Sequence, residues 1–189
     1  MQASSMLAYI FWHRPFSQVA RERYEEAIVR FQSDLARQPP PGFVTAASYS
    51  IEPVPWLGNQ AGYEDWCILQ GSWAMDPLNS FAVGGGVRSA HDSVAALMEE
   101  GHGGLYAHAG GETPPPPQST VYWLTRPRGI QWQAVLDPLR ARYPQANVWR
   151  RQMVLGPAAE FAVSVPGDTE IEVPPSWQAR SVKRLRLPR

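Results

Sequence analysis

The sequence predicts an α+β fold in which strands and helices follow one another in two successive units. A short apolar run at 6–12 gives way after Pro15 to apolar residues spaced by three and four, and prolines 39–41 end that pattern. Later apolar runs have the length of strands and are separated by glycine or proline. After a second proline run, at 114–117, the order of strand and then helix begins again.

The first unit is predicted to be β-α-β-β-α-β. Its strands are expected at 6–12, 43–51, 63–73 and 105–109. The long helix after Pro15 carries one apolar stripe, from Phe16 to Leu35. Residues 75–81 are expected to be irregular. The second helix should follow the glycines at 84–86, with Ser89 or Ser93 as N-cap and Gly101 as its stop.

The second unit is predicted to be a shorter β-α-β-β. Its elements are expected to be a strand at 120–125, a helix at 130–143, a hairpin of 148–155 and 160–165, and an edge strand or solvated tail at 180–187. A proline-containing segment replaces the last helix. The expected division is therefore a unit at 1–112, a linker at 113–118 and a unit at 119–189, packed as one compact domain.

This order of elements resembles the ferredoxin-like dimeric α/β-barrel superfamily in its tandem form, which includes the antibiotic-biosynthesis monooxygenases. The resemblance implies two antiparallel sheets packed face to face as an α/β barrel, with helices outside and a pocket between the sheets. The shortened second unit departs from that pattern, which bears on how the barrel closes. The resemblance further implies a monooxygenase or an isomerase that needs no cofactor and acts on an apolar ring compound.

In such a unit the sheet order is 4-1-3-2, so the end of the first strand lies beside the beginnings of the third and fourth. His13 should then lie near Glu64 or Asp65, and near His102. A histidine beside a carboxylate can act as a general base. Two histidines and one carboxylate could also hold a metal ion, although strand ends often carry such residues only because they face water.

Other residues are candidates for the pocket. His108, with His13 and Asp65, is a candidate catalytic residue, and Tyr9, Trp73 and Tyr106 are candidate pocket residues. The alternative for His108 is a core histidine whose hydrogen bonds are satisfied. Cys67, the only cysteine, lies in an apolar run, where burial would leave its thiol inert. The run from Gly84 to Ser89 could bind an anion at a helix start or simply form a turn.

Composition narrows the classes of function. The 17 basic residues balance the 17 acidic ones, which disfavours a nucleic-acid partner. No apolar run has the length of a membrane span, so a cytoplasmic protein is expected, either a monomer or a homodimer. The main hypothesis is a binder of an apolar small molecule, catalytic and without a cofactor. The alternatives are a non-catalytic module for a ligand or protein, and a haem protein with His108 as axial ligand.

Overall fold

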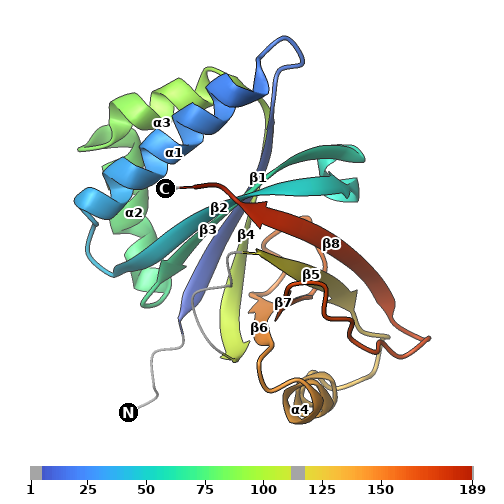
Figure 1. The fold of residues 1–189 in the computed structure, drawn as a ribbon. Coiled ribbons are helices and arrows are strands. Elements are labelled where there is room, and N and C mark those ends of the chain that lie inside the picture. The colour runs from blue at the N-terminus through green and yellow to red at the C-terminus, as the bar shows by residue number, and fades with distance from the viewer. Residues whose placement is uncertain (1–5, 112–117, 189) are drawn as a thin grey trace.

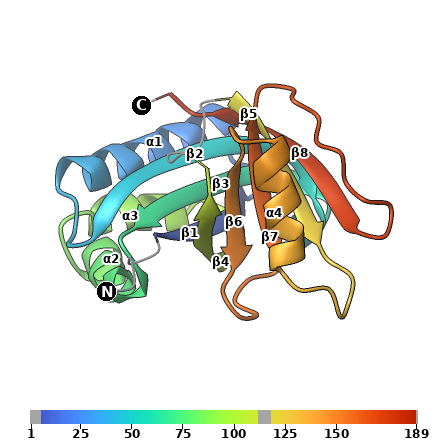
Figure 2. The same cartoon turned by 90° about the horizontal axis from the view of Figure 1, so that it is seen from below.

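A computed structural model describes residues 6–111 and 118–188, in which eight antiparallel strands close into a barrel. The strand order around the barrel is β1-β3-β2-β8-β5-β7-β6-β4. Helices α1, α2 and α3 cover one side of the barrel, and α4 lies on the other side (Figures 1 and 2). The molecule is therefore an α+β barrel with its helices outside.

The first half of the chain supplies four neighbouring strands, in the order β4-β1-β3-β2. Its elements are β1 (Leu7–Pro15), α1 (Arg21–Arg37), β2 (Phe43–Val54), β3 (Gln60–Leu69), α2 (Met75–Gly84), α3 (Arg88–Ala95) and β4 (Met98–Gly110), with short 3-10 turns at Pro55–Leu57 and Ser72–Ala74. The apolar stripe of α1 is confirmed, because Tyr24, Ile28 and Leu35 are buried.

Two predictions around the glycines are wrong. Residues 75–81 are helical, and Pro77 does not prevent this because it lies in the first turn of α2, where its missing N–H costs no hydrogen bond. Gly101 does not stop a helix. It lies inside β4, where a Cβ atom would come within 2.5 Å of the Phe11 ring. The glycine therefore serves the close approach of β4 to β1.

The second half supplies β5 (Gln118–Thr125), α4 (Gln133–Arg142), β6 (Asn147–Arg151), β7 (Phe161–Pro166) and β8 (Gln178–Arg186). The predicted edge strand is β8, but it is not an edge, since it pairs with both β2 and β5 and so closes the barrel. The linker predicted at 113–118 lies outside the described residues except for Gln118, so the division into units stays a prediction.

The interior of the barrel is packed with aromatic side chains. Trp12, Trp66, Trp123 and Trp149 are at most 1% exposed. They contact one another edge to face, for example at 5.4 Å between the ring centroids of Trp12 and Trp123. These indoles therefore occupy the space between the two sheets in which the pocket was expected.

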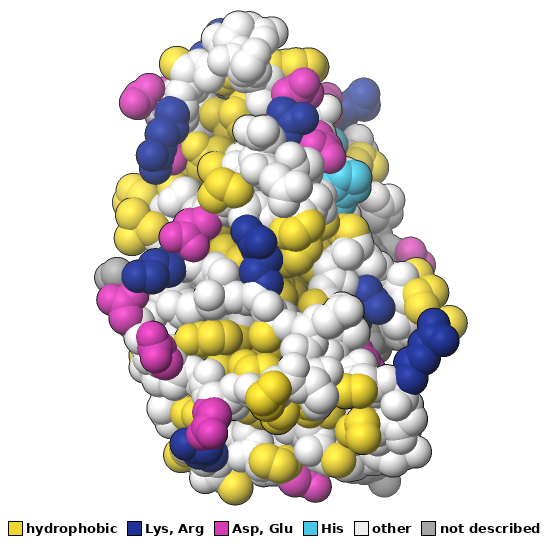
Figure 3. Space-filling view, turned by 90° about the vertical axis from the view of Figure 1, so that its right-hand side faces the viewer, with side chains coloured by type: hydrophobic (Ala, Val, Ile, Leu, Met, Phe, Trp, Pro, Cys, Tyr) yellow, Lys and Arg dark blue, Asp and Glu magenta, His cyan; other side chains and the backbone are white. Residues whose placement is uncertain are grey.

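The surface carries charges of both signs. Figure 3 shows basic and acidic side chains interspersed on one face, with hydrophobic side chains in the hollows between them. No helix within residues 6–111 and 118–188 is long and apolar enough to cross a membrane.

Candidate functional site

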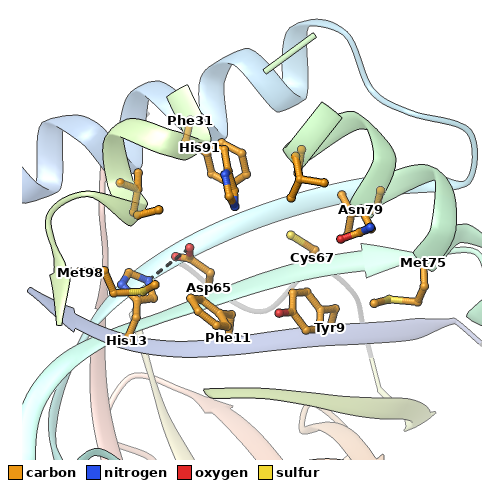
Figure 4. A pocket seen from close by; sticks show the side chains of 15 residues that line it. Tyr9, Phe11, His13, Phe31, Asp65, Cys67, Met75, Asn79, His91 and Met98 are labelled. Carbon is orange, nitrogen blue, oxygen red and sulfur yellow. Dashed lines mark ion pairs between the residues drawn. The ribbon is translucent and has the colours of Figure 1, made fainter. Parts of the chain in front are cut away.

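The main candidate site is a cavity of about 310 Å³ on the outer side of the barrel. Its floor is the outward face of β1 and β3, and α2 and α3 form its roof together with one side chain of α1 (Figure 4). Most of its wall is apolar, with contributions from Phe11, Phe31, Leu78, Val94 and Met98. Such a wall suits an apolar ligand of modest size.

Strand alternation places the polar groups on the floor of the cavity. Tyr9, Phe11 and His13 point outward from β1, while Ile10 and Trp12 between them point into the barrel. On β3, Asp65 and Cys67 share the outward face, and Cys67 is paired with Tyr9 in the strand register. The cavity therefore has a polar end at His13 and Asp65, and Asn79 lies toward its other end (Figure 4).

His13 is held firmly at that polar end. Its side chain is 0% exposed and stacks between the rings of Phe11 and Tyr63, at centroid distances of 5.4 and 5.7 Å. Its Nδ1 lies 2.7 Å from the hydroxyl of Tyr24 on α1. Its Nε2 lies 3.3 Å from Asp65 Oδ2. Three elements thus fix the imidazole ring in one orientation.

Two polar atoms at this end have no hydrogen-bond partner among the described residues. They are Nε2 of His13 and Oδ1 of Asp65. The 3.3 Å approach between Nε2 and Asp65 Oδ2 is close enough for an ion pair but does not meet hydrogen-bond geometry. Buried polar atoms are nearly always hydrogen-bonded in folded proteins. These two atoms therefore have unused hydrogen-bonding capacity at the polar end of the cavity.

The other ionisable groups on the floor remain neutral at ordinary pH. Burial raises the pKa of Tyr9 to about 12, with smaller contributions from Cys67 and Asp65. Burial also raises the pKa of the Cys67 thiol. A thiol that stays protonated is a poor nucleophile, so the prediction that Cys67 is inert agrees with its surroundings.

The alternative partners predicted for His13 lie elsewhere. Glu64 points into the barrel, where it accepts hydrogen bonds from two indole N–H groups. His102 is paired with Trp12 in the register, which places it on the opposite face of the sheet from His13, and it contacts Glu100 at 2.8 Å. No group of three or more potential metal ligands is present in the described part of the chain.

Three predicted residues do not line the cavity. Trp73 lies in the 3-10 turn before α2 and is 55% exposed. Tyr106 points into the barrel and donates a hydrogen bond to the carbonyl of Ala159 at 2.9 Å. The ring of His108 lies 4.8 Å from that of Trp149, and burial lowers the pKa of His108. All three were assigned to a pocket between the sheets, whereas the cavity lies outside the barrel.

Sequence reasoning missed the helical wall of the cavity. Phe31, Asn79, His91 and Met98 come from α1, α2, α3 and the start of β4. The sequence does not show how far the helices lie from the sheet. No sequence pattern therefore marked these residues as lining a cavity. Tyr24 belonged to the predicted apolar stripe of α1, and its contact with His13 could not be read from that stripe.

Comparisons with solved structures agree with this architecture. An anthrone oxidase-like protein superposes with a TM-score of 0.53 at 11% identity, over 97% of this chain and 92% of that protein. A monooxygenase-like protein from Lactobacillus acidophilus NCFM superposes with a TM-score of 0.56 at 8% identity, over 95% and 94% of the two chains.

Both have the dimeric α+β barrel, ferredoxin-like fold. At these identities the likeness shows the fold alone. Searches with protein-family models and against curated protein sequences give no match.

Proposed function

We propose that the cavity binds an apolar ring compound and that the protein is a monooxygenase-like or isomerase-like enzyme acting on it without a cofactor. The observation that carries this proposal is the pair of unpartnered polar atoms, His13 Nε2 and Asp65 Oδ1, at one end of an otherwise apolar cavity. Such a pair can take a proton from a bound molecule while the apolar wall excludes water.

The class of chemistry proposed here is that of two proteins with the same fold, one anthrone oxidase-like and one monooxygenase-like. In an oxygenation of this kind, a ring methylene and dioxygen give a ring carbonyl and water. The methylene carbon loses four electrons, and dioxygen gains them. Asp65, with His13 beside it, would remove the first proton, which leaves an electron-rich anion that can react with dioxygen. An isomerisation would use the same proton transfer and no dioxygen.

Anthrone is a suitable first probe, because it is an apolar three-ring molecule with a reactive methylene. We expect the protein to accelerate oxygen uptake by anthrone above the uncatalysed rate, and Asp65→Asn to remove the acceleration. His102→Ala is the matched control, since His102 lies on the other face of the sheet. Equal rates for the wild type and Asp65→Asn would exclude Asp65 from the reaction.

We also infer that the barrel consists of two ferredoxin-like units in tandem. Around the barrel, the first four strands follow the order β4-β1-β3-β2 and the last four the order β8-β5-β7-β6. Both correspond to the order 4-1-3-2 within their own half. The second unit lacks the helix before its last strand, and the residues before β8 pack beside α4 instead.

The alternative functions predict different results. A non-catalytic binding module would bind an apolar ring compound and turn none over. A haem protein would use His108, but this residue is not on the cavity and packs against Trp149, so we derive no step through haem. A Soret band in protein from haem-sufficient cells would contradict that conclusion.

A further inference from the structure

The hydroxyl of Tyr24 contacts the imidazole ring of His13 and bears on which ring nitrogen carries the proton. Tyr24 lies on α1, is 0% exposed, and its oxygen is 2.7 Å from His13 Nδ1. Burial, followed by the nearby charges of Asp65 and Tyr63, raises the pKa of Tyr24, so the phenol keeps its proton. A phenol has one proton to donate, and Nδ1 is the acceptor within reach.

The position of the imidazole proton follows from this contact. If Nδ1 accepts from Tyr24, the neutral ring carries its proton on Nε2. The other tautomer would turn the lone pair of Nε2 toward Asp65 Oδ2 at 3.3 Å and leave the Tyr24 proton without an acceptor. Both consequences are unfavourable inside a protein.

We propose that Tyr24 holds His13 as the Nε2–H tautomer, so that the polar end of the cavity offers an N–H donor from His13 beside a carboxylate acceptor from Asp65. This inference rests on the proposed function and refines it. Asp65 is then the catalytic proton acceptor, His13 stabilises the negative charge that develops on the ligand, and Tyr24 is a positioning residue.

The donor and the acceptor together define the ligand. One hydroxyl group can satisfy both, since its oxygen accepts from Nε2 and its hydrogen is donated to Asp65. When the proton moves to Asp65, the carboxylate becomes a carboxylic acid and the ligand oxygen becomes an oxyanion held by Nε2–H. The ligand class is therefore a neutral, apolar ring compound with a phenol or enol hydroxyl. A carboxylate ligand would be repelled by Asp65.

Nitrogen NMR of protein labelled at histidine tests the tautomer without any turnover. The chain has four histidines, and the signals that disappear in His13→Gln are those of His13. In the neutral imidazole we expect the proton of His13 on Nε2. Tyr24→Phe should shift the Nδ1 signal, because it removes the donor. Tyr63→Phe is the matched control, since the Tyr63 hydroxyl bonds to Glu25 while its ring stacks on His13.

A proton found on Nδ1 in the wild type would overturn the inference, and that measurement needs no variant to fold. A Nδ1 signal that is unmoved in Tyr24→Phe would overturn it as well.

Binding of three matched probes tests the ligand class. We expect 2-naphthol to bind at least about tenfold more tightly than naphthalene, because it gains a hydrogen bond to a charged group. The affinity for 2-naphthol should exceed that for 2-naphthoate by a similar factor. Asp65→Asn should reduce the difference in affinity between 2-naphthol and naphthalene, and it should improve the binding of 2-naphthoate. Equal affinities for 2-naphthol and naphthalene would overturn this inference and leave the proposed function standing. Failure of all three probes to bind would overturn both.

Discussion

Replacing Arg184 with methionine would leave Glu64 without its counter-ion in the middle of the barrel. The two side chains are at most 3% exposed, and Arg184 Nη1 lies 3.0 Å from Glu64 Oε1. Arg184 also donates to the hydroxyls of Ser119 and Ser164, each at 2.6 Å. Breaking a buried pair from one side costs about 3–5 kcal/mol, because the remaining charge stays buried and unpaired. That is a large part of a typical stability of about 5–15 kcal/mol.

Urea unfolding followed by tryptophan fluorescence and circular dichroism measures this cost. We expect the free energy of unfolding to fall by about 3–5 kcal/mol in Arg184→Met. Lys183→Met is the matched control on the same strand, since the side chain of Lys183 forms an exposed ion pair with Asp168, and the unfolding midpoint of this variant should hardly move. Adding Glu64→Gln to Arg184→Met should restore part of the loss. A loss below about 1 kcal/mol in Arg184→Met would refute the reasoning.

Three further predictions follow from the packing. Gly62→Ala should destabilise the protein by about 1–3 kcal/mol, because its Cβ would come within 2.5 Å of the backbone oxygen of His13. Gly84→Ala is the control, since its Cβ would meet nothing within 4 Å, and its free energy of chemical unfolding should hardly change. The raised pKa of Tyr9, about 12, stabilises the fold below about pH 10, and this contribution is lost as the pH rises through 12. Tyr9→Phe should therefore reduce the fall of the unfolding free energy with pH between those two values. An unchanged slope would contradict the raised pKa of Tyr9. The thiol of Cys67, buried and with a raised pKa, should react with DTNB slowly in the native protein and fast in urea; fast native labelling would show that it is not buried.

Local patterns were sufficient to predict most of the elements. The spacing in α1 and the apolar runs of β1, β2 and β5 were visible in the sequence, because burial of one helix face or of whole strands leaves a periodic record. The pairing of His13 with Asp65 could be anticipated from the order of the strands. That prediction depended on topology, and it left Glu64 as an equal alternative.

The arrangement that fills the barrel could not be predicted. The nature of the side chains alone suggests that Leu185 of β8 is buried and Arg184 exposed, yet Leu185 is 56% exposed and Arg184 is 3% exposed. Glu64, distant in sequence, reverses the pattern by providing a buried counter-charge. The pocket was predicted between the two sheets for a related reason. The four indoles fill the interior of the barrel, and the open space lies under the helices instead.

Methyl NMR of the methionines tests the central claim, that the cavity under α2 and α3 is the binding site. Met75 and Met98 line the cavity, whereas Met153 lies outside it and is 84% exposed. Titration with 2-naphthol should shift the methyl signals of Met75 and Met98 in a saturable way and leave that of Met153 unchanged. Saturable binding that leaves both Met75 and Met98 unmoved would place the ligand elsewhere and contradict the account.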